Sequence, residues 1–322
     1  MSDLSALARD RPLLTRELHP VNAWYGHADV LKRYTGWPLR RSLKVAIEHG
    51  PWMDEEVWKV DARTRMPIYV CASPQRAAFF ERRTGIEAAA IGPMIRYVMP
   101  ENPALPEDPR TVAFPAHSTH HAEAKYAVEA FMAQLERVAK TSEVVVCLYW
   151  RDALLGLADV FERRGFRCVT AGHLYDAGFL DRLAKILASA SRVVTNEIGT
   201  HVLYAALLNR PVFVASQPVE YVQERELANH RGDRDHPRVR RTRELFAVEA
   251  AAITSEQRSF VNELLGTSAF RTPTELREIL EAAEGRYRAL PWNRRARIML
   301  ARERHFASQQ LALLRSSRAA GA

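Results

Sequence analysis

A group of polar residues follows a β-branched apolar run at residues 192–195 and precedes a helix-like run. Its members are Asn196, Glu197, Gly199, Thr200 and His201. A helix that begins near Gly199 directs free backbone N–H groups and the positive end of its dipole toward the end of the strand, which favours a phosphate group. The Glu197 carboxylate can accept hydrogen bonds from ribose hydroxyls, and His201 can pair with a phosphate or a sugar carboxylate. The pattern predicts a nucleotide-binding site, with a plain helix cap by Asn196 as the alternative.

A second group of this kind, His117, Ser118 and Thr119, follows an apolar run that starts at residue 111. We expect Ser118 and Thr119 to cap a helix and, with His117, to bind an anion. His120 and His121 extend the cluster, but adjacent side chains at a helix start point apart, and no nearby carboxylate pair completes a ligand set. No metal site is therefore expected.

Alternating strands and helices would hold these groups in place. Apolar runs predict strands at 43–50, 66–73, 88–94, 111–118, 142–150, 166–172, 192–197 and 211–216. Helical patterns fall between them at 74–85, 121–140, 152–165, 177–190 and 199–210. Because the strands are apolar on both faces, the fold class is α/β, with parallel sheets covered by helices. Residues 217–270 are expected to be helical and charged, and further helices are expected at 273–288 and 292–316.

Further polar residues follow other predicted strands. Ligands of open parallel sheets bind at the carboxyl ends of the strands. Glu48 and His49 follow the first strand, and Ser73, Arg151 and His173 follow later ones. We expect all five to line a binding cleft.

The best domain boundary is 99-MPENPALPEDPR-110, where four prolines make the chain extended and semi-rigid. We expect a smaller N-terminal α/β lobe at 1–105 and a larger Rossmann-like lobe at 106–270. Residues 271–322 then form C-terminal helices, for which packing back on the N-terminal lobe is one arrangement.

Composition narrows the protein class. The 46 Lys and Arg residues outnumber the 38 Asp and Glu residues, which gives a net charge of +8 and favours anionic partners. Cys71, Cys147 and Cys168 lie in strand-like runs without metal-ligand spacing, as buried reduced thiols do. The sequence contains neither a signal-peptide core nor an apolar run of the ~20 residues that a membrane span needs. We expect a cytoplasmic protein, with attachment at the inner face of the membrane left open by the Arg-rich amphipathic last helix.

Two other motifs, one for metal-diphosphate binding and one for nucleic-acid binding, have only weak candidates in the sequence. The Asp233-Arg234-Asp235 pattern matches a metal-diphosphate motif of some sugar transferases, but it lies in the charged run 230–244 and follows no strand. The same run is the best candidate for nucleic-acid binding. It lacks interleaved aromatic residues, so no nucleic-acid partner is expected.

Four segments resemble the two-domain GT-B glycosyltransferases of bacterial capsule and lipopolysaccharide synthesis, with a Kdo-transferase-like branch as one option. They are 48-EHGPW-52, the stretch from 69-YVCASPQRAAFF-80 to 91-IGPMIRYV-98, 113-AFPAHST-119, and 194-VTNEIGTHVLYAALLNRPVFV-214. The last segment resembles the donor-nucleotide site, where the usual ending is "GKPV"; here Asn209 stands in the place of the glycine.

The resemblance implies a metal-independent transferase without a cofactor, which moves a sugar from a CMP-, UDP- or GDP-linked donor to a glycan or glycolipid acceptor. It implies a donor site on the C-terminal lobe and an acceptor site on the N-terminal lobe, where His49 or Glu48 is the candidate catalytic base. A nucleotide-sugar epimerase or hydrolase on the same scaffold remains an alternative. A non-catalytic module of polysaccharide assembly is another.

Overall fold

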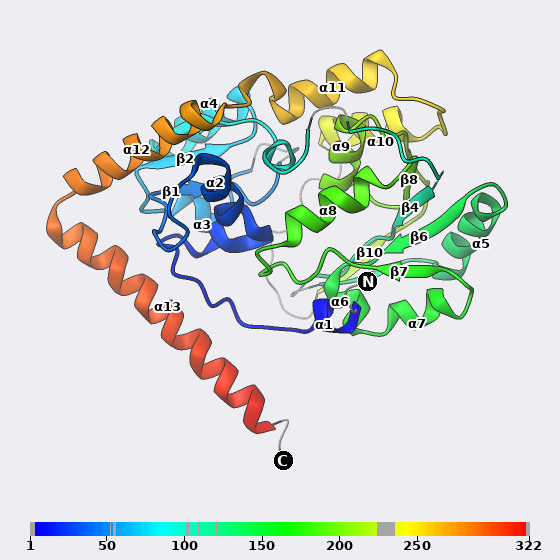
Figure 1. Cartoon of the computed structure of the whole chain (residues 1–322), viewed down its shortest axis with the longest axis horizontal. Coiled ribbons are helices and arrows are strands. Elements are labelled where there is room, and N and C mark those ends of the chain that lie inside the picture. The colour runs from blue at the N-terminus through cyan, green and yellow to red at the C-terminus, as the bar shows by residue number, and fades with distance from the viewer. Residues whose placement is uncertain are drawn as a thin grey trace. The chain divides into compact units, whose positions relative to one another are not determined.

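The computed structural model describes residues 4–51, 53, 56–100, 103–108, 110–119, 122–223 and 236–319, with the backbone alone for 223 and 312–319. The chain folds into two compact units. Unit 1 comprises Met1–Asp10, Met99–His173 and Asp181–Glu263, and unit 2 comprises Arg11–Val98, Leu174–Leu180 and Leu264–Ala322. Each unit holds its own parallel sheet, so the predicted α/β class is confirmed (Figure 1).

Unit 1 is built on a five-stranded parallel sheet with the order β7-β6-β4-β8-β9. Its strands are β4 (Arg110–Phe114), β6 (Glu143–Cys147), β7 (Arg167–Val169), β8 (Arg192–Thr195) and β9 (Val212–Val214). Valine recurs in β6, β8 and β9, because branched side chains pack well on a pleated surface that is covered on both faces. One layer of the core consists of Phe131, Leu135, Val146 and Phe161, all of which are buried.

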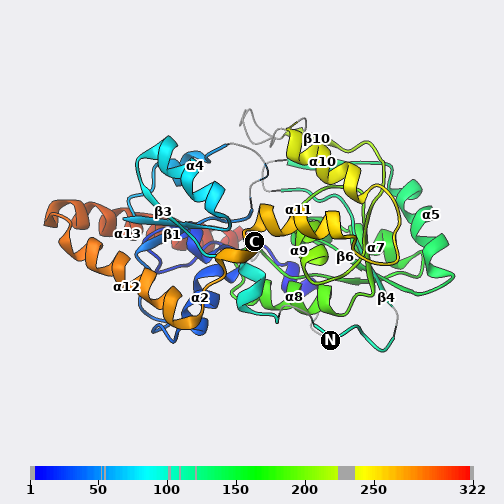
Figure 2. The same ribbon diagram turned by 90° about the horizontal axis from the view of Figure 1, so that it is seen from above.

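Helices cover both faces of this sheet (Figures 1 and 2). They are α1 (Leu4–Ala8), α5 (Val128–Ala139), α6 (Trp150–Leu154), α7 (Leu157–Glu162), α8 (Phe179–Ala188), α9 (Thr200–Leu207), α10 (Pro237–Phe246) and α11 (Ser255–Leu265). The predicted helix at 152–165 is wrong in one respect, because it is two helices. Gly156 adopts a φ of 85° between α6 and α7, which ends the first helix.

Two segments that were predicted as helical contain strands instead. β5 (Ala122–Lys125) occupies the start of the predicted 121–140 helix, and β10 (Glu220–Gln223) lies within the predicted 217–270 helical region. The two strands pair antiparallel, with Glu220 opposite Lys125. Residues 122–125 alternate between half-buried and exposed, which is the period of a strand, and this tertiary pairing overrides their helix propensity.

Unit 2 is built on a three-stranded parallel sheet with the order β1-β2-β3. Its strands are β1 (Val45–Ile47), β2 (Ile68–Cys71) and β3 (Glu87–Ala90). Its helices are α2 (His27–Thr35), α3 (Lys59–Ala62), α4 (Pro74–Thr84), α12 (Pro273–Ala289) and α13 (Trp292–Ala319), with 3-10 turns η1 (Pro20–Gly26), η2 (Met94–Tyr97) and η3 (Thr267–Ala269). Tyr69 stacks on Phe80 in its core at 3.7 Å between ring centroids. The predicted helices at 74–85, 273–288 and 292–316 are confirmed.

The two units divide the chain differently from the boundaries expected at residues 105 and 270. The first ten residues belong to unit 1, because the backbone N–H of His173 donates to the Leu7 carbonyl at 3.0 Å. The C-terminal helices belong to unit 2.

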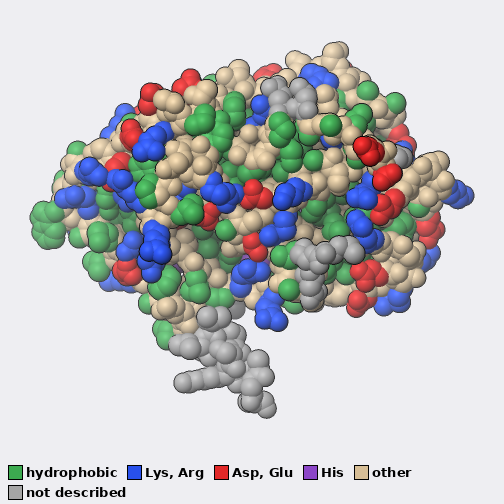
Figure 3. All heavy atoms as spheres, in the orientation of Figure 1, with side chains coloured by type: hydrophobic (Ala, Val, Ile, Leu, Met, Phe, Trp, Pro, Cys, Tyr) green, Lys and Arg blue, Asp and Glu red, His purple; other side chains and the backbone are tan. Residues whose placement is uncertain are grey.

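The surface carries mixed charge. Lys and Arg side chains spread across the face shown in Figure 3, with acidic side chains among them. Within the described part of the chain, no helix is both long enough and apolar enough to cross a membrane. Cys71, Cys147 and Cys168 are buried and unbonded to one another, as expected.

Candidate functional site

The strand order of unit 1 places the two predicted polar groups side by side. From β4 the chain runs to β6 and β7 on one side of the sheet, and then returns to β8 and β9 on the other side. The reversal occurs between β4 and β8, where Phe114 pairs with Thr195. In open parallel sheets, the crevice beyond the carboxyl ends of the strands at such a reversal binds the ligand. The loops that leave β4 and β8 carry the residues expected at the donor site.

The loop after β8 is ordered by the hydroxyl of Thr195. This hydroxyl donates to the Glu197 carbonyl at 2.9 Å and accepts from the Glu197 N–H at 3.2 Å. His201 Nε2 lies 3.1 Å from the same oxygen. These contacts converge on one hydroxyl, which holds the His201 ring against the loop after β8.

His201 is a neutral group in this environment. Its ring stacks on Phe114 at 4.8 Å between centroids. Burial, and then the nearby His117, lower the pKa of His201 to about 3. The sequence suggested a charged partner for a phosphate, but a neutral ring provides hydrogen bonding rather than charge.

Gly199 opens the N-terminus of α9. It occupies the N-cap position, and no described side chain caps this end of the helix. A Cβ atom at this position would lie 3.0 Å from the Nδ1 atom of His201, so a larger residue would crowd the ring. The first N–H groups of α9, with Thr200 at its first position, thus have no side-chain cap within the described chain, and uncapped N–H groups at a helix N-terminus favour an anion.

Asn196 ties two loops together instead of capping α9, so the alternative of an Asn196 cap is wrong. Its Oδ1 accepts from the Ala116 N–H at 2.7 Å, and its Nδ2 donates to Gln217 Oε1 at 2.7 Å. Asn196 is 3% exposed. It holds the loops after β4 and β9 in register with the β8 loop and acts as a positioning residue.

The loop after β4 does not begin a helix. Thr119 forms a turn with Ala122, because its N–H donates to the Ala122 carbonyl at 2.7 Å, and the chain then enters β5. The predicted helix cap by Ser118 and Thr119 is therefore wrong. Thr119 is exposed, and Ser118 is buried.

The carboxylate of Asp152 holds this loop in place, a role that the sequence analysis did not predict. The Ser118 N–H donates to both carboxylate oxygens of Asp152 at 3.1 Å. Burial raises the pKa of Asp152, against hydrogen bonds from Ser118. His117 remains half-buried at the rim, with its ring 4.6 Å from that of Tyr149. Asp152 follows the end of β6, so the rule that selected the other polar residues after strands could also have selected it.

Arg151 and His173 are placed differently from each other. Arg151 lies half-buried in the first turn of α6, directly beyond β6. His173 is fully buried, with its ring 4.1 Å from that of Trp150 and its Nε2 atom 3.3 Å from Asp10 Oδ1. His173 thus anchors the N-terminal segment of unit 1.

In unit 2, Glu48 belongs to a buried ion pair. Arg76 Nε donates to Glu48 Oε1 at 2.6 Å, and the Ala72 N–H donates to Oε2 at 3.3 Å. Burial raises the pKa of Glu48, while Arg76 opposes that shift. The hydroxyl of Ser73 caps α4 by accepting from the Arg76 N–H at 3.3 Å. Glu48 and Ser73, which were predicted to line the cleft, thus form hydrogen bonds within unit 2 that stabilise its fold.

His49 lies among aromatic rings that the sequence reasoning missed. Its centroid is 4.7 Å from that of Trp58 and 5.6 Å from that of Trp24. Trp24 also contacts Tyr175 at 6.2 Å. All four rings are half-buried at the carboxyl end of β1. Their positions 24, 49, 58 and 175 are too scattered for a local pattern to reveal the cluster.

The remaining predicted positions give less information. His120, His121, Trp52 and the Asp233–Asp235 pattern lie outside the described residues. Among the residues that the structure does describe, no three His, Cys, Asp or Glu side chains are grouped to hold a metal ion. Asn209 adopts a φ of 61°, so it fills the left-handed position that the glycine of the "GKPV" pattern would take.

Comparisons with known proteins give only distant similarities. No known protein family matches the sequence, and no curated protein matches it. In structure, the chain is similar to a GtfA/B complex (12% identity, TM-score 0.35, 74% of this chain and 52% of that one). It is also similar to sucrose-phosphate synthase from Thermosynechococcus elongatus (14%, 0.33, 78% and 71%) and to TarM (12%, 0.33, 75% and 50%). The chain spans about half the length of the first and the third.

Proposed function

We propose that this protein is a glycosyltransferase that takes a sugar from a nucleotide-sugar donor and passes it to a glycan or glycolipid acceptor of a bacterial surface polysaccharide or lipopolysaccharide. The observation that carries the proposal is the reversal of strand order between β4 and β8, after which the loops with His117 and the Glu197–His201 segment leave adjacent strands. The ordered set of GT-B-like segments in the sequence supports the same conclusion.

The donor's phosphate is best received by the N-terminus of α9. Gly199 gives a phosphate access to the backbone, and the hydroxyl of Thr200 adds a donor. The Glu197 carboxylate suits ribose hydroxyls, which donate hydrogen bonds, and the neutral ring of His201 lies next to it in the same segment. His117, half-buried at the rim, is the remaining polar side chain for the phosphate.

His49 is a better candidate for the catalytic base than Glu48. Glu48 already pairs with Arg76, whereas His49 is half-buried among Trp24, Trp58 and Tyr175. Aromatic rings offer apolar faces of the kind that pack against the C–H face of a sugar ring. An acceptor sugar held on these rings would present its hydroxyl to the imidazole of His49, the type of side chain that most often serves as general base.

The reaction exchanges one C–O bond for another. The acceptor hydroxyl oxygen attacks the anomeric carbon, the bond from that carbon to the phosphate oxygen breaks, and its electron pair leaves with the nucleotide. His49 takes the acceptor proton in an inverting reaction. The N–H groups at α9 stabilise the negative charge that develops on the leaving phosphate.

Contact with a membrane surface fits such an acceptor. Helix α13 exposes Trp292, Met299 and Leu300, whose spacing of seven and eight residues places them on one helical face. Several arginines of the same helix suit anionic lipid. Co-sedimentation with anionic vesicles tests this contact, and Trp292→Ser should weaken it.

The first test is thermal stabilisation of the full chain by CMP, CDP, UMP, UDP, GDP, ADP and TDP, with and without Mg²⁺. A ligand that binds the folded state raises the Tm, and one selective shift would identify the donor base. Glu197→Ala and His201→Ala should abolish that shift, while Thr119→Ala on the neighbouring turn should retain it. The absence of a shift with every nucleotide would contradict the donor site.

The second test separates transfer from related reactions. With the identified donor, His49→Ala should lose turnover and keep nucleotide binding. Turnover that requires no acceptor would instead identify a nucleotide-sugar epimerase or hydrolase.

A further inference from the structure

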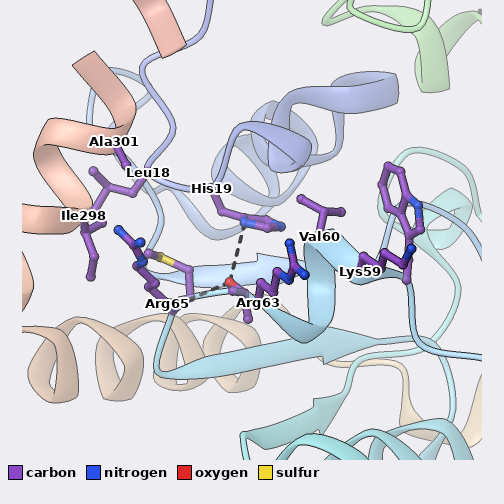
Figure 4. Close-up of a pocket in the computed structure, with 11 residues that line it drawn as sticks. Leu18, His19, Lys59, Val60, Arg63, Arg65, Ile298 and Ala301 are labelled. Carbon is purple, nitrogen blue, oxygen red and sulfur yellow. Dashed lines mark hydrogen bonds between the residues drawn. The ribbon is translucent and has the colours of Figure 1, made fainter. Parts of the chain in front are cut away.

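A pocket of about 500 Å³ lies wholly within unit 2, beside α3 and α13 (Figure 4). Its size falls in the range of pockets that bind small molecules. None of the residues expected from the sequence at the donor site lines it. A ligand of this pocket would therefore be different from the donor nucleotide.

One part of the pocket wall is positively charged. Lys59, Arg63 and Arg65 line it, and all three are exposed. None of the described residues that line the pocket is acidic. Within the described chain, neither Lys59 nor Arg63 forms a salt bridge, and Arg65 contacts only the Arg297 carbonyl, at 3.4 Å. The three cations gather around one cavity and favour an anion.

Another part of the wall is apolar. Leu18, Met66, Ile298 and Ala301 supply it, and the last two come from α13. Figure 4 shows Leu18, Ile298 and Ala301 grouped together, with Arg65 next to them. A small inorganic anion would leave this apolar surface uncovered, whereas an alkyl chain would bury it.

A buried polar pair lies behind the charged part of the wall. His19 is 6% exposed, and its Nε2 atom has no hydrogen-bond partner among the described residues. It lies 3.7 Å from Asp61 Oδ1, and Asp61 is completely buried. The Nδ1 atom of His19 lies 3.5 Å from the Thr64 hydroxyl, as the dashed line in Figure 4 marks. His19 is thus a buried polar group at the pocket with spare hydrogen-bonding capacity.

A second pocket of unit 2 shows that such charge imbalance is not general. That pocket, of about 600 Å³, is lined by the carboxylates of Glu17 and Asp29 as well as by Arg16, Lys32 and Arg40. Lys32 forms a buried ion pair with Glu17. This pocket therefore carries carboxylates among its cations, whereas the described lining of the pocket at α3 and α13 carries cations without any carboxylate.

We propose that the pocket at α3 and α13 binds an anionic amphiphile with one long alkyl chain, such as an alkyl phosphate monoester. The phosphate lies against Lys59, Arg63 and Arg65, and the chain lies against Ile298 and Ala301. Trp58 lines the same pocket and packs 4.7 Å from His49, so the ligand's head lies next to the candidate acceptor site. The binding itself does not depend on the proposed transferase activity.

The test is isothermal titration of the full chain, without nucleotide, with dodecyl phosphate below its micelle concentration. We expect saturable binding of one molecule. Inorganic phosphate tests the head alone, and dodecanol tests the chain alone; each should bind at least about tenfold more weakly, because each makes part of the contacts. Equal binding by inorganic phosphate would overturn the amphiphile assignment and leave a free anion as the ligand.

Two variants locate the site. Arg63→Ala should weaken dodecyl phosphate binding by about tenfold, because it removes a charged hydrogen-bond donor. Ala301→Trp should fill the apolar part and abolish binding; Ala301 is exposed on α13, so the helix tolerates the larger residue. Arg82→Ala, an exposed arginine on α4, is the matched control and should bind normally. Unchanged affinity in both pocket variants would overturn the proposal.

Discussion

Polar residues follow the strands of both parallel sheets, but they differ in burial and in pairing. In unit 2, Glu48 and Ser73 follow β1 and β2, but both are buried, with Arg76 as their common partner. In unit 1, His117 and Glu197 follow β4 and β8 and stay half-buried at the rim. A polar residue after a strand therefore indicates a ligand site only where the surrounding structure leaves it accessible.

Strand order explains the difference. The sheet of unit 2 runs β1-β2-β3 without reversal, and at its strand ends Glu48 and Ser73 pair with Arg76 while His49 stays half-buried. The sheet of unit 1 reverses between β4 and β8, and such a reversal is where open parallel sheets bind their ligands. The predictions that follow test this contrast, starting with the largest expected effect.

Replacing Glu48 should mainly destabilise the protein. Glu48→Gln leaves the guanidinium of Arg76 buried without its counter-charge, which costs about 3–5 kcal/mol of unfolding free energy. Urea denaturation measures this loss, and Glu278→Gln, an exposed change on α12, should cost little. A Glu48→Gln protein with normal stability and no turnover would instead restore Glu48 as a catalytic candidate.

Stability should fall in acid because of two buried histidines, one in each unit. Burial, and then His49, lower the pKa of His27 from 6.5 to about 3, and His201 is lowered to about 3 as well. The unfolded chain therefore binds more protons between pH 6.5 and 3, so the free energy of unfolding drops as the pH falls through that window. Each histidine contributes a slope of about 1.4 kcal/mol per pH unit.

Denaturation midpoints measured from pH 7 to pH 4 check this expectation. His27→Gln should make the pH dependence shallower, whatever its effect at pH 7. An unchanged slope in His27→Gln would mean that this ring already carries a proton in the folded state.

Removing the loop bridge of unit 1 should have a moderate effect. Asn196→Ala leaves the Ala116 N–H and Gln217 Oε1 without their partner, at a cost of about 1–3 kcal/mol. Because the bridge positions the β8 loop, nucleotide affinity should fall as well. Calorimetry on the folded variant measures the affinity, and an unchanged value would show that the loops after β4 and β9 do not shape the site.

The smallest effect is expected for Thr119. Its side chain is exposed, so Thr119→Ala should change the free energy of unfolding by less than about 0.5 kcal/mol and leave nucleotide binding intact. A lost nucleotide shift would place Thr119 back at the donor site.

The sequence by itself determined the α/β class, the strands of both sheets and the position of α9 after β8. These features depend on local patterns: valine runs, the Pro and Gly that bound α4, and the small residues from Asn196 to Thr200. The strands β5 and β10 escaped the sequence because each pairs with a segment about a hundred residues away, and local propensity contains no information on that partner.

Only the tertiary structure decided which polar residues are available for chemistry. It paired Glu48 with Arg76, placed Asp152 beneath Ser118, buried His173 with Trp150 and gathered Trp24, Trp58 and Tyr175 around His49. It also assembled the pocket from α3 and α13, which are separated by more than two hundred residues of chain. Burial and pairing depend on segments that meet only when the chain folds, so residue type and spacing alone could not distinguish a ligand-binding group from a structural one.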